Sequence, residues 1–329
     1  MKRYLFPFVL LAAFACSEEG IRNETDYDFS SSNILSFKDG TEISSYLHQK
    51  ENKSGTQFIS MESRYREALN KLDAAETADQ LNSIMKDYAD VVVLKDETYR
   101  PVFTNSSYRK IINKDRLYVS GGMIHKVVND QYIVFTEKKY INDLLKIEST
   151  EDLDSRFSLA RYQSSSQLPG NGRVMANCGD DLYADYFDNH TKCKDDRRAW
   201  VHGHAFYMMS GSQYTPWALC EVYGEKRSGT FCNWNNYATV LHYKNCSFTV
   251  KLAINGTTLY YPIPHSSLAD YDGTGDETSH EIYYDAVGTA VTWGGGTPPS
   301  AQFDAIHLEG STQGVGANDP THWAVLDCQ

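Results

Sequence analysis

Six of the seven cysteines lie in the second half of the chain, and they constrain its fold more than any other feature. They are Cys178, Cys193, Cys220, Cys232, Cys246 and Cys328. An even set of cysteines in an exported chain is typical of disulfide bonds, and no C-x₂-C pair with the spacing of a zinc site is present. We therefore predict disulfides among all six, with the pairing left open, and a C-terminus held to the fold through Cys328.

The region around these cysteines is rich in strand-forming residues. Short β-branched and aromatic runs alternate with turn residues, and Asn255-Gly256 has the composition of a two-residue hairpin. The expected strands lie at residues 200–209, 217–223, 237–243, 248–254, 259–261, 282–284, 290–293, 305–308 and 323–326. Strands at this spacing predict an all-β domain at residues 177–329, built as a disulfide-stapled sandwich or jelly roll.

The first half of the chain has a different pattern. Apolar residues recur at helical spacing between residues 61 and 72, and Thr77 and Gln80 form a capping box that opens a second helix. After Asp90 the pattern changes to short apolar runs separated by Gly and Asn, which predict antiparallel strands. Residues 33–155 therefore predict a small α+β domain, and the Ser-, Gln- and Gly-rich residues 156–176 predict a linker.

The N-terminal segment predicts export. Lys2 and Arg3 precede an apolar run at residues 4–15, which is shorter than the about 20 apolar residues that span a bilayer. Residues 1–15 therefore predict a signal peptide. The small residues before Cys16 resemble the lipobox of bacterial lipoproteins, which implies that Cys16 is acylated and that residues 16–32 form a flexible tether. The alternative is ordinary secretion of a soluble periplasmic protein.

The residues after Cys16 extend this resemblance. Ser17, Glu18 and Glu19 resemble the acidic export signal that sends lipoproteins of the Bacteroidetes type to the outer face of the outer membrane. With the α+β pattern and with residues 224–229 before an aromatic strand, they make the chain similar to surface lipoproteins of gut Bacteroidetes that contain domains of unknown function. The resemblance implies a protein anchored by lipid in the outer membrane and exposed at the cell surface. It implies no active site.

Composition excludes some classes of partner. Hydrophobic residues make up 41% of the chain and charged residues 22%, as in globular proteins. The formal net charge is −12, so we expect no binding to nucleic acid and no electrostatic attraction to anionic lipid.

Residues 270–281 resemble an EF-hand calcium loop. The positions that supply ligands hold Asp270, Asp272, Thr274, Asp276 and Glu281. Gly273 stands where the loop turns sharply, but Glu277 replaces the usual apolar residue and a strand pattern follows. The segment is therefore interpreted as either a calcium site or a solvated acidic turn. Calcium is the one cofactor that the sequence suggests.

Two histidines lie two residues apart in an expected strand. His202 and His204 should therefore point to the same face. Such a pair is typical of half a metal site or of an acid/base pair, with Asp195, Asp196 or Glu221 nearby as a further ligand. Histidines on a solvated strand face have the same spacing.

Aromatic residues are concentrated between residues 200 and 243, with asparagines among them. Aromatic faces next to amides suit sugar rings, and Trp217, Trp234 and Tyr237 are the candidate ligand-binding residues. Trp234 lies between two asparagines in a turn-like segment, which predicts that it is exposed. The alternative is that these aromatics fill the sandwich core.

The sequence contains none of the common catalytic signatures. It has no G-x-S-x-G elbow, no H-E-x-x-H motif and no papain-like cysteine segment, and no carboxylate pair stands out. We expect first a non-enzymatic surface module that binds a glycan or a protein. The alternatives are an extracellular hydrolase of glycan or peptide, with His202 and His204 in its cleft, and a structural subunit of a surface appendage.

Overall fold

The chain from Asn33 to Gln329 forms one compact unit. The computed structural model describes residues 33–49, 58–162, 170–171, 174–175, 178, 181–188, 196–254, 256–275, 277–292, 299–312 and 323–328. The expected signal peptide, tether and Cys16 lie outside these residues. The expected fold class is confirmed, with an α+β first part and an all-β, disulfide-containing second part. The linker expected at residues 156–176 lies partly outside the described residues, so the expected division into two domains stays a prediction.

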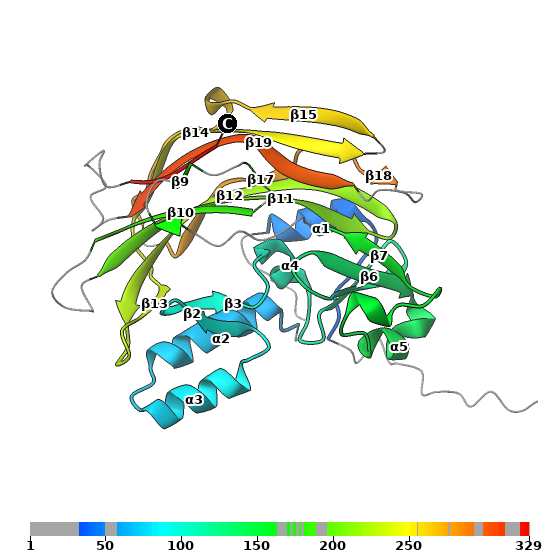
Figure 1. Ribbon diagram of the computed structural model, residues 1–329, viewed down its shortest axis with the longest axis horizontal. Coiled ribbons are helices and arrows are strands. Elements are labelled where there is room, and N and C mark those ends of the chain that lie inside the picture. The colour runs from blue at the N-terminus through cyan, green and yellow to red at the C-terminus, as the bar shows by residue number, and fades with distance from the viewer. Residues whose placement is uncertain are drawn as a thin grey trace, which may run out of the picture. The chain divides into compact units, whose positions relative to one another are not determined.

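Four of the five helices described in the first part, all but the last, begin at side-chain caps. The described residues contain α1 (Gly40–Leu47), α2 (Met61–Asp73), α3 (Ala78–Asp87), α4 (Ser106–Ile111) and α5 (Ile141–Leu145) (Figure 1). Ser60 caps α2, and the predicted capping box of Thr77 and Gln80 opens α3. Asn105 caps α4, which the sequence analysis did not predict. A cap satisfies backbone N–H groups that have no partner inside the helix.

A five-stranded sheet completes the first part, in the order β1-β4-β5-β6-β7. Its strands are β1 (Ser36–Phe37), β4 (Leu117–Ser120), β5 (Met123–Val127), β6 (Tyr132–Glu137) and β7 (Ser158–Arg161). The strands from β4 to β7 pair antiparallel in sequence order, which confirms the antiparallel strands expected after Asp90. β1 lies parallel to β4 at one edge.

The largest sheet has nine strands and combines both parts of the chain. Its main path is β2 (Val92–Lys95), β3 (Thr98–Pro101), β13 (Asn233–Asn236), β12 (Gln213–Ser228), β11 (Arg197–Ser210), β10 (Asp181–Asp188) and β8 (Gly170–Asn171). β17 (Ser279–Ala286) and β18 (Val291–Thr292) also pair with β12. The hairpin of β2 and β3 joins the sheet where Thr98 pairs with Trp234.

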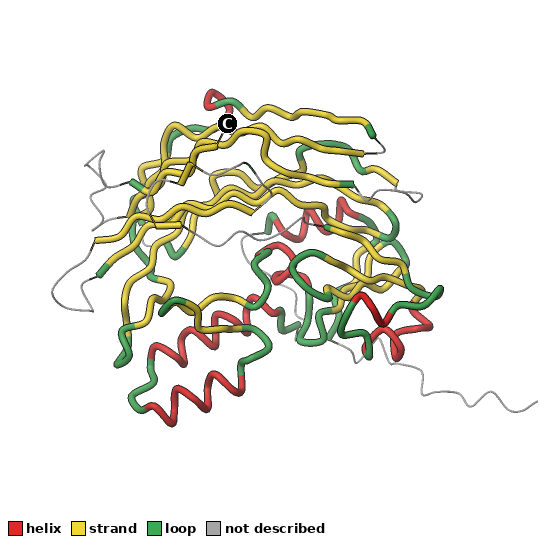
Figure 2. The backbone as a smooth tube through the Cα atoms, viewed as in Figure 1, coloured by secondary structure: helices red, strands yellow, loops and turns green. Residues whose placement is uncertain are grey.

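A six-stranded sheet packs against one face of the large sheet and forms the sandwich (Figure 2). It contains β15 (Thr257–Ile263), β14 (Leu241–Ile254), β19 (Ser300–Thr312), β20 (Ala324–Cys328), β9 (Val174–Met175) and β16 (Tyr271–Asp272). Ile254 pairs with Thr257, so β14 and β15 form the hairpin expected at Asn255-Gly256, although Asn255 itself lies outside the described residues.

Two glycines allow the sheets to approach closely. A Cβ atom on Gly203 of β11 would lie 2.4 Å from Ile306 Cδ1 of β19, and one on Gly310 would lie 2.4 Å from Val201 Cγ1. Phe303 of β19 is fully buried at this interface. Burial of a side chain of that size contributes about 1.5–3 kcal/mol to the stability of the fold. The two sheets can bury it only because glycines stand at the positions of closest approach, where a larger residue would not fit.

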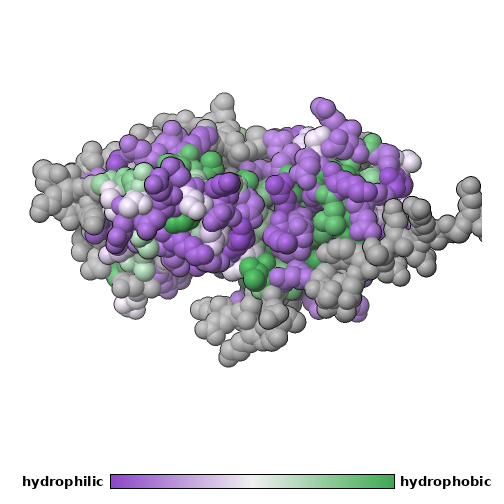
Figure 3. All heavy atoms as spheres, turned by 90° about the horizontal axis from the view of Figure 1, so that it is seen from below, coloured by the Kyte–Doolittle hydropathy of each residue, from purple (hydrophilic) through white to green (hydrophobic). Residues whose placement is uncertain are grey.

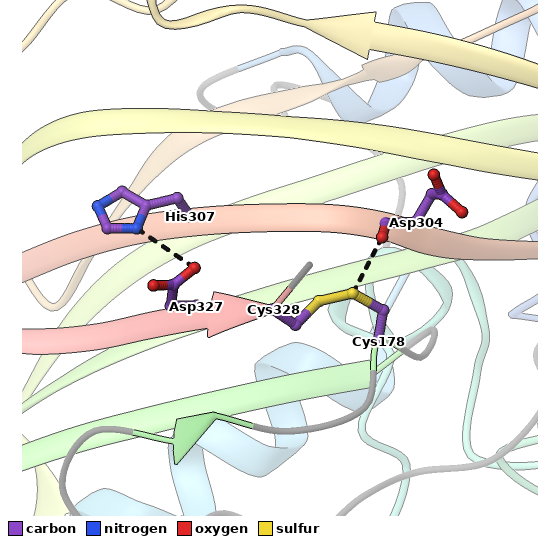
Figure 4. The surroundings of a disulfide bond; sticks show 5 residues. All are labelled: Cys178, Asp304, His307, Asp327 and Cys328. Carbon is purple, nitrogen blue, oxygen red and sulfur yellow. Dashed lines mark hydrogen bonds and ion pairs between the residues drawn. A yellow bond between two sulfur atoms is a disulfide. The ribbon is translucent and has the colours of Figure 1, made fainter.

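The cysteines form fewer disulfides than predicted. Cys178 and Cys328 are joined, which ties the strand β20 to a segment 150 residues earlier, and the Cys178 sulfur lies beside the Asp304 carbonyl (Figure 4). Cys232 is also disulfide-bonded, and Cys193 lies outside the described residues. Cys220 and Cys246 are free, so the prediction for these two is wrong. Both are buried in the sandwich, where thiols pack as small apolar groups.

The described surface is largely hydrophilic on the face shown in Figure 3, with smaller apolar areas. Its exposed large apolar side chains are Ile59, Val93, Leu94, Leu259 and Tyr260. None of the helices in the described part of the chain is long and apolar enough to cross a membrane.

Candidate functional site

A cleft of about 680 Å³ lies against the nine-stranded sheet. Residues from β11, β12, β13 and β17 line it on one side, and residues from α2, the β2–β3 hairpin and α4 line it on the other. Figure 1 shows α2 and the hairpin next to β13, although these segments are far apart in the sequence. The cleft therefore exists because the first part of the chain packs on the sheet of the second.

Three rows of paired side chains cross the floor of the cleft from β11 to β12. The register pairs Arg198 with Glu225, Trp200 with Tyr223, and His202 with Glu221. Side chains alternate between the two faces of a strand, so these residues share one face, while Gly203 and Cys220 belong to the sandwich face. The two faces of the same strands thus have different chemistry.

Glu225 is the most buried carboxylate of the floor, with a side chain that is 2% exposed. It accepts hydrogen bonds from Trp200 Nε1 at 2.6 Å and from Arg198 Nε at 2.8 Å, and Arg100 Nη1 lies 3.5 Å away. Burial alone would raise the pKa of Glu225, but the charges of Arg198 and Arg100 outweigh it and lower the pKa. Glu225 is therefore a fully paired, ionised anchor of this end of the cleft.

Guanidinium groups cover the indole rings at the same end. The Arg198 guanidinium carbon lies 4.4 Å from the ring centroids of both Trp200 and Trp234, and that of Arg100 lies 4.1 Å from Trp200. Trp234 is only 5% exposed, so the prediction that it is exposed is wrong. It was wrong because the asparagines beside it belong to β13, which pairs with β12 and with the β2–β3 hairpin.

The opposite end of the floor holds an imidazole and two carboxylates. His202 Nδ1 lies 3.1 Å from Glu221 Oε1, and the register places Glu221 opposite Glu281 of β17. Lys110 Nζ of α4 lies 3.2 Å from Glu281 Oε1. Burial would raise the pKa of Glu221, but the hydrogen bond and charge of His202 and the charges of Lys110 and Arg109 lower it.

Arg109 fixes the wall beside this end. Its Nε donates to Glu62 Oε2 of α2 at 2.8 Å, and its Nη1 donates to the backbone carbonyls of Phe103 and Thr104. Burial would raise the pKa of Glu62, but the charges of Arg109 and Arg66 lower it to about 2. This ion pair joins α4 to α2 and so places the next residue, Lys110, over the floor.

The lining of the cleft is electrically balanced. It contains seven Lys or Arg side chains and seven Asp or Glu side chains. Exposure differs along the floor: the Glu221 side chain is 16% exposed and that of Glu281 is 45% exposed, against 2% for Glu225. A ligand therefore meets carboxylates most readily at the Glu221 end.

The other residues singled out from the sequence lie in different places. Trp217 is buried next to Phe206 and Tyr284, so it offers no exposed ring. Tyr237 is half-buried beneath Arg197 and Lys226 and does not line the cleft. Of the three, Trp234 alone lines it.

The two histidines do share one face, as predicted, with ring centroids 5.4 Å apart. His202 lines the cleft, whereas His204 is fully buried and contacts Phe206. Within the described ranges, no group of three or more His, Cys, Asp or Glu side chains could hold a metal ion.

The expected calcium ligands are dispersed among other partners. Asp272 contacts His242, Asp270 accepts from the Asn245 backbone N–H, and Glu281 points into the cleft. Asp276 lies outside the described residues, so calcium binding by the whole loop stays a prediction. Thermal unfolding with calcium and with EDTA would test it.

Comparisons with family models, curated proteins and solved structures returned no match. Function must therefore be argued from the geometry of the cleft itself. Arg100, Arg109 and Lys110, three of the seven cationic side chains of the lining, were not predicted as site residues from the sequence. Nothing local in the sequence shows that Arg100 and Lys110 contact carboxylates on strands more than a hundred residues later.

Proposed function

We propose that this protein is a lipid-anchored surface protein that binds a neutral carbohydrate in the cleft. The observation that carries the binding proposal is the equal number of cationic and anionic side chains in the lining, in a chain whose net charge is −12. A charged ligand would leave part of this lining without a counter-charge. A neutral polar ligand would not.

Sugar hydroxyl groups match such a lining. Each hydroxyl donates one hydrogen bond and accepts others, so an oligosaccharide that spans the cleft can accept from the guanidinium of Arg100 at one end and donate to the carboxylate of Glu281 at the other. Hydrogen bonds with one charged partner are about twice as strong as neutral ones. Because the indole rings are already covered by arginines, recognition is proposed to rest on hydrogen bonds rather than on stacking.

Calorimetry with the purified protein would test the binding proposal. The titrants are neutral oligosaccharides, oligosaccharides of uronic acids, and short peptides. We expect heat of binding from a neutral oligosaccharide, and Arg100→Ala should weaken that binding about tenfold, or about 1.4 kcal/mol. Binding of uronates or peptides alone would overturn the proposal.

Arg64→Ala is the matched control for Arg100→Ala. Arg64 also covers an aromatic ring, that of Tyr88 at 4.6 Å, and also pairs with a carboxylate, that of Asp90 at 2.9 Å. It lies outside the lining of the cleft. Its replacement should leave carbohydrate affinity unchanged, so an equal loss in both variants would show that the effect is not local.

The anchor requires a separate test. Its support is the resemblance of the residues around Cys16 to a lipobox and of Ser17, Glu18 and Glu19 to an acidic export signal. We expect incorporation of labelled palmitate into the wild-type protein and none into Cys16→Ala. Protease added to intact cells should degrade the wild-type protein, and full protection would place it inside the envelope.

A further inference from the structure

Glu221 and Glu281 are paired across two adjacent strands, next to a register shift between Cys220 and Glu221, and both line the cleft. Residues directly opposite in an antiparallel pair have Cβ atoms about 4.5–5.5 Å apart, and like charges at such positions destabilise a sheet. Two carboxylates in this arrangement therefore need compensation. His202, Lys110 and Arg109 supply it, with contacts of 3.1 Å from His202 to Glu221 and 3.2 Å from Lys110 to Glu281.

The geometry points to a glycosidase centre: we propose that the cleft hydrolyses a glycosidic bond, with Glu221 as nucleophile and Glu281 as proton donor. This inference rests on the proposed binding of a carbohydrate in the same cleft. Both carboxylates line the cleft, so both can touch a bound sugar. The amino acids are those that glycoside hydrolases use, a pair of carboxylic acids on either side of the scissile bond.

The surroundings of the two carboxylates give them different roles. Glu221 is 16% exposed and accepts a hydrogen bond from His202, and Lys110 and Arg109 add positive charge that keeps it ionised. An ionised, partly buried carboxylate is suited to attack carbon. Glu281 lies opposite Glu221 and its side chain is 45% exposed, so it is placed to deliver a proton to a departing oxygen.

The reaction proceeds in two balanced steps. First, an oxygen of Glu221 bonds to the anomeric carbon, the glycosidic C–O bond breaks, and the proton of Glu281 moves to the leaving oxygen. Second, Glu281 takes a proton from a water molecule, the water oxygen bonds to the anomeric carbon, and the bond to Glu221 breaks with its electron pair returning to the carboxylate. One water molecule is consumed, and neither an oxidant nor a metal is required.

The strand register also sets the stereochemistry. Carboxyl groups about 5–5.5 Å apart lead to retention of configuration, whereas inverting enzymes separate them by about 6.5–9.5 Å. The side chains of direct neighbours leave their strands with Cβ atoms only about 4.5–5.5 Å apart, so we expect carboxyl groups in the shorter range. The predicted product therefore has the anomeric configuration of the substrate.

The test uses the full chain, a panel of nitrophenyl glycosides of neutral sugars, and the corresponding 2-deoxy-2-fluoro glycosides as traps of a covalent intermediate. We expect turnover of at least one glycoside and a glycosyl adduct that mass spectrometry assigns to Glu221. Glu221→Gln should abolish both signals, and Glu281→Gln should slow turnover of substrates with poor leaving groups about 10²–10⁴-fold. Calorimetry on the same samples should show that both variants still bind the carbohydrate, because glutamine keeps an oxygen that accepts a hydrogen bond.

Glu309→Gln is the matched control. Glu309 of β19 also pairs with a histidine, His307, at 3.0 Å, and is 19% exposed, but it lies outside the cleft. Its turnover should equal that of the wild type. If the wild-type protein binds a carbohydrate yet shows neither turnover nor adduct, or if the adduct forms on another residue, the catalytic inference is overturned and the binding proposal stands. If no carbohydrate binds, both are overturned.

Discussion

The two faces of β11 and β12 show how one pair of strands supports two environments. On the sandwich face, Gly203 and Cys220 pack against the second sheet in a dry interior. On the cleft face, Arg198 and Glu225 are almost as buried, yet they are charged. The apolar face is therefore sensitive to added volume, and the charged face is sensitive to loss of one partner. Substitutions on the two faces should therefore destabilise the fold for different reasons.

The largest expected effect is on the charged face. Glu225→Ala leaves Arg198 buried without its carboxylate, and breaking a buried pair in this way costs about 3–5 kcal/mol. Urea unfolding would measure the loss. The double variant Arg198→Met/Glu225→Leu should recover part of it, because it removes both charges of the most buried pair, although Arg100 and the Trp200 N–H also lose this carboxylate. A double variant as unstable as the single one would show that the loss does not come from an unpaired buried charge.

Acid should lower the unfolding free energy through Glu62, which also lines the cleft. The pKa of Glu62 is about 2 in the folded protein, below its ordinary value of 4.5, so this carboxylate stabilises the fold fully above about pH 4.5. That contribution, about 3 kcal/mol, is lost as the pH falls from 4.5 towards 2. Glu62→Gln should flatten the dependence of the unfolding free energy on pH in this range. An unchanged slope would show that Glu62 titrates normally.

The apolar face should be sensitive to a single methyl group. Gly203→Ala would place a Cβ atom 2.4 Å from Ile306 Cδ1, and overpacking of this kind costs about 1–3 kcal/mol. Gly275→Ala serves as the control, because its Cβ would meet no atom within 4 Å. Equal unfolding free energies for the two variants would mean that the sheets can separate without cost.

The smallest effect concerns the free thiols of the apolar face. Cys220 and Cys246 are buried, and burial raises the pKa of the Cys246 thiol to about 12. Both should resist alkylation in the folded protein and react once it is unfolded, as peptide mapping by mass spectrometry would show. Cys246→Ala should change stability by only about 1 kcal/mol. Rapid labelling of the native protein would place these thiols at the surface.

Local features were predictable from the sequence, and long-range pairings were not. The caps at Thr77 and Gln80 and the shared face of His202 and His204 depend only on neighbouring residues. The place of Cys220 on the sandwich face follows from its alternation with Glu221 along β12, but no local signal shows that its thiol is free. The pairing of Thr98 with Trp234, which brings Arg100 to the cleft, has no local signal.

The pairing of two carboxylates was likewise not predictable from local sequence. Glu221 and Glu281 both stood out in the sequence, but as ligands of two different metal sites. Only the register between β12 and β17 brings them to one place. A register between strands so distant depends on the whole sheet, and no short motif encodes it.

The hairpin of β2 and β3 also bears on how the protein acquires its fold. Tyr99 accepts a hydrogen bond from Asn233, a residue 134 positions later, so synthesis delivers one wall of the cleft long before the strand that completes it. Contacts at such separation make folding slow, on the order of milliseconds to seconds. During that interval the edge of β3 that pairs with β13 in the finished sheet is open, which is the part of the nascent chain where a chaperone would be most useful.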